Sequence, residues 1–282
     1  MIKPYFEAKN FILYAGDVFE VMQQFDPESI DMIFADPPYF LSNDGITCQS
    51  GKMVSVNKGK WDKSLGFEED IEFTDSWIKA CKTVLKKDGS IWISGTLHII
   101  YKVGFILEKN KFDIINDIIW YKPNAPPNLS CKYFTHSHEI ILWARKQKNA
   151  KHNFHYELMK HWDNPKDKLK NPGKQMRSVW SIPLLPPNEK RNGKHPTQKP
   201  LELLNRIISA SSNEGDLVLD PFVGSGSTGV ACSILNRRFI GIDINTNYLD
   251  LAIKRFKDEN KKQLLFRPKN DLHITKYFSP SS

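Results

Sequence analysis

Short apolar runs rich in β-branched residues alternate with helical patterns along most of this 282-residue chain. Residues 30–35 (Ile-Asp-Met-Ile-Phe-Ala) and 238–242 (Arg-Phe-Ile-Gly-Ile) are typical of buried strands. Strands that alternate with helices usually pair in parallel, because each crossover helix packs back onto the sheet. The pattern therefore predicts an α/β fold with a mostly parallel, doubly wound sheet and helices on both faces.

The same pattern predicts an order of elements. Strands are expected at residues 11–14, 30–35, 90–94, 114–121, 139–144, 216–219 and 238–242. Helices are expected at 18–24, from 77 to a stop at Asp88-Gly89, from Pro200 as the first helical residue, at 228–235 and at 249–256. Residues 40–66 lack periodicity, which predicts a long loop with Trp61 as a packing anchor or an ordinary core residue.

Composition narrows the class of protein. No apolar run is long enough to span a membrane and no basic-then-apolar leader is present, so we expect a cytoplasmic protein. The four cysteines form no Cys-x-x-Cys pair, which favours reduced thiols. A metal site at Cys131, His136 and His138 is the alternative, but a fourth ligand at fitting spacing is missing, so no metal is predicted.

The net charge of +8 is concentrated in one segment. Residues 145–195 contain thirteen Lys and Arg against four acids, which leaves the remainder of the chain close to neutral. Aromatic residues stand among these charges, as in surfaces that bind polyanions. The alternative is a solvated Lys-rich loop. Candidate contacts to a nucleic-acid partner are Lys174, Gln175, Arg177, Arg191 and Lys194.

A glycine-rich turn predicts a nucleoside site. Gly224-Ser225-Gly226-Ser227-Thr228-Gly229 fits G-x-G-x-x-G between a predicted strand and a predicted helix. Asp243 ends the next strand, where a carboxylate can accept hydrogen bonds from both ribose hydroxyls. These residues alone do not separate a nicotinamide cofactor from another nucleoside, and glycines used only for a tight turn are a further alternative.

Asp17 also ends a predicted strand, at the edge where ligands of an open parallel sheet collect. Its carboxylate there could accept from the amino group of an adenine. The alternative is that Asp17 only caps the helix that follows.

The tetrapeptide Asp36-Pro37-Pro38-Tyr39 suits chemistry on an exocyclic amine. The lone pair of such an amine is delocalised into its ring, and two acceptors on its hydrogens make the nitrogen more nucleophilic. The Asp36 carboxylate and the Pro37 carbonyl could be these acceptors, held rigidly by two prolines. Tyr39 could stack on an extruded base. A Pro-rich strand exit without chemistry is the alternative.

The two motifs closely resemble those of amino-methylating DNA methyltransferases that use S-adenosylmethionine. In that family Asp-Pro-Pro-Tyr marks adenine-N6 and cytosine-N4 enzymes, and a leading Asp favours adenine. The resemblance implies cofactor binding by the turn at Asp220, Pro221, Phe222, Gly224, Ser225, Gly226 and Ser227, and a motif His195-Pro196-Thr197-Gln198-Lys199-Pro200 beside the methionine part. The motif order, catalytic first, resembles the circularly permuted β group.

More narrowly, residues 38–43, 58–62 and 128–131 resemble the second, single-strand-tolerant GATC adenine methylase of DpnII-type restriction systems. The resemblance implies a catalytic half at 1–145, a target-recognition region at 146–194, a cofactor-binding half at 195–266 and a mobile tail at 267–282. It also implies base flipping, protection of DNA from a partner endonuclease without a required complex, and a homodimer, since dimers occur in the family.

Other functions stay open from the sequence alone. Cytosine N4 or an RNA base could be the methylated amine, although Asp36 argues against cytosine. Protein-glutamine methylases usually begin the tetrapeptide with Asn. A nucleic-acid-binding module without catalysis would retain the fold but not require Asp36, Tyr39, Gly224 and Asp243.

Overall fold

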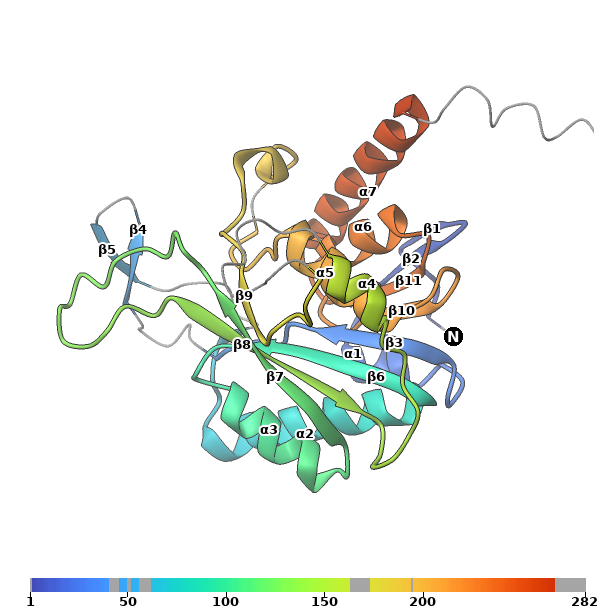
Figure 1. The fold of residues 1–282 in the computed structure, drawn as a ribbon, viewed down its shortest axis with the longest axis horizontal. Coiled ribbons are helices and arrows are strands. Elements are labelled where there is room, and N and C mark those ends of the chain that lie inside the picture. The colour runs from blue at the N-terminus through green and yellow to red at the C-terminus, as the bar shows by residue number, and fades with distance from the viewer. Residues whose placement is uncertain are drawn as a thin grey trace, which may run out of the picture.

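The computed structural model describes residues 2–40, 46–49, 52–55, 62–162, 173–193 and 195–266. The expectations for Trp61, for Lys194 and for the tail after Phe266 lie outside these residues. The described chain forms one large sheet with helices on both faces, and Figure 1 shows this layering. The predicted α/β class is confirmed.

The sheet of the described residues has nine strands in the order β1-β2-β11-β10-β3-β6-β8-β7-β9. Neighbouring strands run parallel from β2 through β6, whereas β1 and β8 run antiparallel to their neighbours and β9 is parallel to β7. The strands are β1 (Phe6–Ala8), β2 (Phe11–Ala15), β3 (Ile30–Ala35), β6 (Leu85–Gly95), β7 (Asp113–Tyr121), β8 (His138–Arg145), β9 (Val179–Ser181), β10 (Leu217–Asp220) and β11 (Arg238–Asp243).

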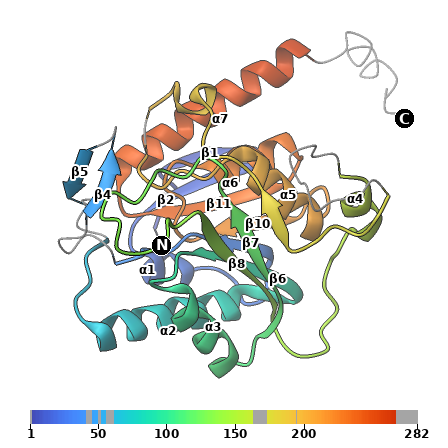
Figure 2. The same cartoon turned by 60° about the vertical axis from the view of Figure 1, so that its left-hand side comes forward.

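Two apolar clusters fill the space between the sheet and its helices. One face packs against α1 (Val18–Met22), α2 (Phe67–Val84) and α3 (Ile100–Lys109). The other packs against α4 (Tyr156–His161), α5 (Leu201–Ser211), α6 (Ser227–Ile234) and α7 (Thr246–Phe266). Figure 2 shows α7 on the face of the sheet opposite α2 and α3, with its carboxyl end extending past the strands. None of the helices described is both long and apolar enough to cross a membrane.

The end of α2 corrects one prediction. The helix ends at Val84 rather than at Asp88-Gly89, and Leu85 already begins β6. Leu85 is fully buried and pairs with Ile30, so burial in the sheet outweighs the helical spacing of this residue. Gly89 has a different role from the one expected, because a Cβ there would lie 2.9 Å from the carbonyl oxygen of Asp31 on the neighbouring strand.

Pro200 is also shifted from its expected place. It is the N-cap of α5, with extended backbone, and Leu201 is the first helical residue. A proline is suited to either position, since it has no N–H to leave unpaired at a helix start.

The segment between residues 40 and 66 contains structure that the sequence pattern did not indicate. β4 (Ile46–Gln49) and β5 (Lys52–Ser55) pair antiparallel as a hairpin apart from the main sheet. The basic segment 145–195 also contains elements, namely α4, β9 and the short 3-10 helix η2 (Pro187–Lys190). Trp180 of β9 is buried in the core and pairs with Trp120 of β7, so this segment is joined to the sheet edge.

The motifs meet because their strands are neighbours. β3 ends immediately before Asp36, and β10 ends at Asp220, immediately before the glycine turn. β3 and β10 pair in parallel through Met32–Val218 and Ile33–Leu219, so their carboxyl ends lie at the same edge. Open α/β sheets bind ligands at this edge.

Candidate active site

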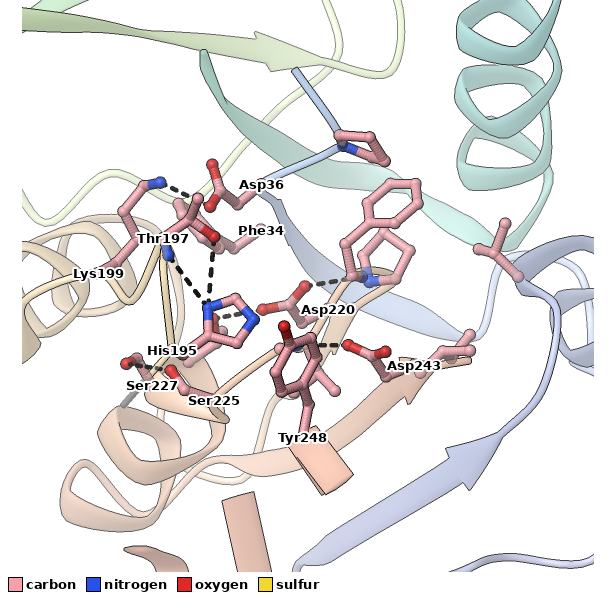
Figure 3. A pocket seen from close by; sticks show the side chains of 18 of the residues that line it. Phe34, Asp36, His195, Thr197, Lys199, Asp220, Ser225, Ser227, Asp243 and Tyr248 are labelled. Atoms are coloured by element: carbon pink, nitrogen blue, oxygen red, sulfur yellow. Dashed lines mark hydrogen bonds and ion pairs between the residues drawn. The ribbon is translucent and has the colours of Figure 1, made fainter. Parts of the chain in front are cut away.

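A cavity of about 260 Å³ opens at the carboxyl ends of β2, β3, β10 and β11. Figure 3 shows side chains from opposite halves of the sequence facing one another across it. The sequence-predicted residues that line it are Asp17, Asp36, Pro38, Lys199, Asp220, Pro221, Phe222, Gly224, Ser225, Ser227 and Asp243. Of the other described residues predicted for the site, Pro37, Tyr39, Pro200 and Gly226 do not line the cavity.

The glycine turn forms one wall of the cavity. Gly224 and Gly226 have φ values of +48° and +74°, which favour glycine over other residues. A Cβ at Gly226 would lie 2.5 Å from the Cβ of Ala252 on α7. Arg255 of α7 donates to the Ser225 carbonyl at 2.8 Å and to the Ser227 hydroxyl at 2.7 Å. The turn is therefore held by α7, an interaction that the motif did not predict.

Two acids flank this turn. Asp220 accepts from the Phe222 backbone N–H at 3.0 Å and from the Thr228 hydroxyl at 2.5 Å. Burial raises the pKa of Asp220 to about 7, in spite of these two donors. Asp243 accepts from the N–H groups of Gly224 and Asn245, both at 2.8 Å. Desolvation by burial raises the pKa of Asp243 as well, although both N–H groups lower it.

Asp17 caps the helix that follows it and also lines the cavity, and its contact with an adenine stays a prediction. Its Oδ1 accepts from the N–H of Phe19 at 2.8 Å and so caps α1. The same residue lines the cavity next to Gly16 and Val18. One carboxylate oxygen therefore organises the helix start, and the side chain still belongs to the cavity wall.

Asp36 lies at the other end of the cavity and is held by two donors. Its Oδ1 accepts from the Tyr39 hydroxyl at 2.5 Å, and its Oδ2 accepts from the Lys199 ammonium at 2.6 Å. Tyr39 is only 4% exposed, so its ring is packed inside the protein rather than offered to solvent. Burial raises the pKa of Asp36, opposed chiefly by the charge of Lys199.

A second ion pair completes this cluster and was not predicted from the sequence. Glu139 of β8 accepts from Lys122, and its Oε2 lies 3.5 Å from the Lys199 ammonium and 3.4 Å from the Tyr39 hydroxyl. The two acids and two lysines sum to zero charge. Burial acts to raise the pKa of Glu139, but Lys199 and Lys122 outweigh it and lower this pKa to about 2.

The pKa of Lys199 follows the same balance. Desolvation lowers it, and the charges of Asp36 and Glu139 outweigh desolvation, so the pKa of Lys199 is raised. Lys199 is thus a buried cation held by two carboxylates. Its position could be anticipated from the His-Pro-Thr-Gln-Lys-Pro motif, whereas nothing in the sequence near Lys122 or Glu139 indicated a link to Asp36.

Asp62 positions the backbone that follows the Asp-Pro-Pro-Tyr motif. This fully buried residue accepts from the N–H groups of Tyr39 and Phe40 at 2.8 and 2.9 Å. Phe40 has a φ of +56°, which is uncommon outside glycine. The two hydrogen bonds stabilise this turn, and the turn places the Tyr39 hydroxyl on Asp36.

His195 and Tyr248 cover the cavity beside the glycine turn. Their rings meet edge to face with centroids 4.2 Å apart, and a Cβ at Gly224 would lie 3.0 Å from the His195 ring. Thr197 donates its N–H to Nδ1 of His195 at 3.3 Å. Figure 3 shows Thr197, His195 and Tyr248 in this order between Lys199 and Asp243. Tyr248 was missed because nothing in its helix suggested a role beyond packing.

The four candidate DNA contacts that the structure describes do not line the cavity. Lys174, Gln175 and Arg177 are exposed, and Arg191 pairs with Asp258 of α7 at 3.1 Å. Within the described part of the chain, no three or more His, Cys, Asp or Glu side chains are grouped so that they could hold a metal ion. The search included Cys131, His136 and His138, the residues of the alternative metal site.

The fold and the cavity define a methyltransferase that uses S-adenosylmethionine. The residues fit this cofactor, since Asp17 and Asp243 place carboxylates on the cavity wall on either side of the glycine turn, where a nucleoside offers hydrogen-bond donors. The model of the DNA methylase family that includes N6 and N4 enzymes matches residues 30–254. The chain belongs to this family.

Similar proteins support this assignment. Type II methyltransferase M2.DpnII of Streptococcus pneumoniae is 55% identical over 262 residues, covering 93% of this chain and 95% of the relative. M2.MboI of Moraxella bovis is 50% identical, covering 91% and 92%. The crystal structure of an M1.HpyAVI–SAM complex is 28% identical with a TM-score of 0.62, covering 87% of this chain and 98% of that one. The protein is thus a DNA methyltransferase of restriction–modification type, with S-adenosylmethionine as its methyl donor.

The PvuII DNA methyltransferase, described as cytosine-N4-specific, has a TM-score of 0.68 at 19% identity, covering 94% of this chain and 95% of that one. This likeness concerns the fold alone.

Proposed function

We propose that this protein methylates N6 of adenine in GATC sites, in both double- and single-stranded DNA, after extruding the base from the helix. The observation that supports it most directly is the position of Asp36. Its carboxylate lies at one end of the cavity whose opposite end is formed by the glycine turn and Asp243. A base amine bound at Asp36 would face the cofactor's reactive end within one cavity.

The chemistry follows from lone pairs. S-adenosylmethionine supplies a methyl group bound to a positively charged sulfur. Asp36 has about four lone-pair sites, and Tyr39 and Lys199 use two of them, so acceptor capacity remains for an amine hydrogen. The Pro37 carbonyl would accept the second hydrogen. The nitrogen lone pair then forms the new N–C bond as the C–S bond breaks, and the electron pair of that bond stays on sulfur.

The proton that leaves the nitrogen needs an acceptor, and Asp36 is the candidate. Burial raises its pKa, which makes it a better base than an exposed aspartate. Lys199 stays protonated beside it because its own pKa is raised. The role of the Tyr39 ring as a stacking platform requires that it leave its buried position, and it stays a prediction.

The GATC target and the choice of adenine come from relatives and from the motif. M2.DpnII and M2.MboI are similar over nearly the whole chain. The leading Asp36 favours adenine over cytosine. The order of the motifs, Asp36 before Gly224, supports assignment to the circularly permuted β group. A partner endonuclease, a homodimer, a cytoplasmic location and the target-recognition role of 146–194 are proposals of the same kind.

Transfer of labelled methyl from S-adenosylmethionine to matched oligonucleotides tests the proposal. Double- and single-stranded forms with GATC, and with the same bases scrambled, are compared, and the modified nucleoside is identified. N6-methyladenine only with GATC, on both strand forms, is the expected result. N4-methylcytosine would overturn the adenine assignment, and label in scrambled DNA would overturn the target.

A further inference from the structure

Among the described residues, the loop between β7 and β8, residues 122–137, carries the most exposed aromatic side chain, Phe134. Phe134 is 97% exposed and Tyr133 is 60% exposed. Figures 1 and 2 both show the loop extending beyond the sheet on the side of the β4–β5 hairpin. We call residues 122–137 the aromatic loop. Exposed aromatic rings are the side chains on which proteins stack nucleic-acid bases.

The stem of the aromatic loop belongs to the catalytic cluster. Lys122 at one end pairs with Glu139 just beyond the other, and the Lys122 N–H donates to the Ser137 carbonyl at 2.8 Å. Glu139 in turn lies 3.4 Å from the Tyr39 hydroxyl. Phe134 lies five positions before Glu139, so the Cα atoms of the two residues are at most about 18 Å apart along an extended chain. That distance is comparable with the width of the major groove, about 12 Å.

Hydrogen bonds hold the loop tip in a defined shape. The Asn128 amide donates to the Tyr133 carbonyl at 2.7 Å, and its Oδ1 accepts from the Ser130 N–H at 3.0 Å. The Asn128 N–H donates to the Thr135 hydroxyl at 3.3 Å. The two rings are therefore presented by a braced turn rather than by a freely moving chain. A preorganised aromatic loses little entropy on binding.

The side chains of the aromatic loop favour a nucleic acid as its occupant. Residues 122–137 contain no acid, Lys132 and His136 are exposed beside the rings, and Lys122 is already paired with Glu139. Two exposed rings among basic and amide side chains suit a base stack between phosphates better than they suit an apolar protein surface. Extruding a base leaves a gap in the duplex, and enzymes of this kind must offset the lost stacking.

We propose that Phe134, supported by Tyr133, inserts into the duplex and fills the space that the extruded target base leaves. This inference rests on the proposed base extrusion. It concerns the extrusion step alone: Phe134 would stabilise the opened duplex and would contribute nothing once the target base is already unpaired.

The test compares three DNAs that share one target site: a normal duplex, the same duplex with an abasic site opposite the target base, and the single strand. Phe134→Ala should lower the rate on the normal duplex about 10-fold or more, the range of a lost base–aromatic stack. The rate on the abasic duplex should stay within about 2-fold of the wild type, because unpairing is cheap there. Phe134→Trp should restore the normal duplex rate.

Phe105→Ala is the matched control, since Phe105 is 66% exposed on α3. It should leave all rates unchanged. A second readout uses 2-aminopurine in place of the target base, whose fluorescence rises on extrusion. Phe134→Ala should reduce that rise without changing cofactor binding.

Equal loss on all DNAs, or no loss on any, would overturn the role of Phe134. A change in particle mass for Phe134→Ala by sedimentation, with unchanged extrusion, would instead place the ring between copies of the chain. An error in the adenine or GATC assignment would be seen in the product that the wild-type enzyme makes. The comparison of Phe134→Ala with the wild type would still be valid at whichever site is methylated.

Discussion

The ammonium group of Lys199 lies 2.6 Å from Oδ2 of Asp36, although 163 residues separate them in the chain. The side chains are only 5% and 12% exposed. Lys199 also donates to the Tyr39 hydroxyl at 3.0 Å. The Asp-Pro-Pro-Tyr motif and the segment before α5 are therefore joined electrostatically in a site from which water is largely excluded. Loss of the Lys199 charge would leave Asp36 buried without this cation, whereas Lys199 would still have Glu139 at 3.5 Å if Asp36 lost its charge.

Lys199→Met should destabilise the fold and shift the pH dependence of methyl transfer. Removing one member of a buried ion pair typically costs about 3–5 kcal/mol. Without the cation the pKa of Asp36 rises further, so the rate should need a higher pH than in the wild type. Urea unfolding and a pH–rate profile measure the two effects. Lys199→Arg, which retains the charge, is the control, and an unchanged profile for Lys199→Met would contradict the prediction.

Asp36→Asn should reduce methyl transfer by about 100-fold or more while sparing cofactor affinity. The amide keeps the shape of the carboxylate but loses its charge and half of its acceptor capacity. Equilibrium dialysis with S-adenosylmethionine and single-turnover methylation separate binding from chemistry. Asp31→Asn, which removes an acid at the opposite end of β3, is the control. Near-normal turnover of the Asp36 variant would remove this residue from the mechanism.

Gly226→Ala should impair cofactor binding and destabilise the protein more than Gly215→Ala does. Both glycines have positive φ, +74° and +81°, so each alanine pays a conformational cost of about 1 kcal/mol. The new Cβ would collide with α7 at Gly226, whereas a Cβ added at Gly215 would have no neighbouring atom within 4 Å. Thermal unfolding and cofactor titration give the comparison. Equal effects of the two variants would show that the collision is relieved easily.

Asp220→Asn should flatten the pH dependence of stability. The folded pKa of Asp220 is about 7, above its unfolded value, so the native state binds a proton more tightly than the unfolded state. Its contribution to stability is therefore greatest at low pH and declines as pH rises from about 4 to about 7. The decline should approach about 1.4 kcal/mol per pH unit. Urea unfolding of the wild type and the variant at pH 5, 6, 7 and 8 measures how the free energy of unfolding of each depends on pH. The two pH dependences should be the same if Asp220 ionises normally.

Lys174→Gln and Arg177→Gln should weaken DNA binding about equally for all sequences and reduce its salt dependence. Each lost phosphate contact lowers the slope of log K against log salt by about 0.9. Lys9→Gln is the control, because Lys9 precedes β2 at the amino-terminal edge of the parallel strands, opposite the cavity. Binding isotherms at several salt concentrations measure the slope. A selective loss for one sequence would indicate base contacts instead.

The strands and the turn that form the cavity wall were predictable because their determinants are local. The strand at Ile30–Ala35 was predicted with its observed bounds, and the glycine turn lies between β10 and α6 as its motif requires. Helix ends were less predictable, as α2 shows. Leu85 has helical spacing, yet it is buried beside Ile30 in the sheet, and no local pattern contains that pairing.

The sequence by itself determined the fold class and the two motifs, because apolar periodicity and turn chemistry act over a few residues. Only the tertiary structure decided that Lys122 and Glu139 join Asp36 and Lys199. Those contacts depend on β8 running antiparallel to β6, which brings the start of β8 to the carboxyl ends of the parallel strands. Strand order arises from packing over the whole chain, and an ion pair between distant segments has no local pattern.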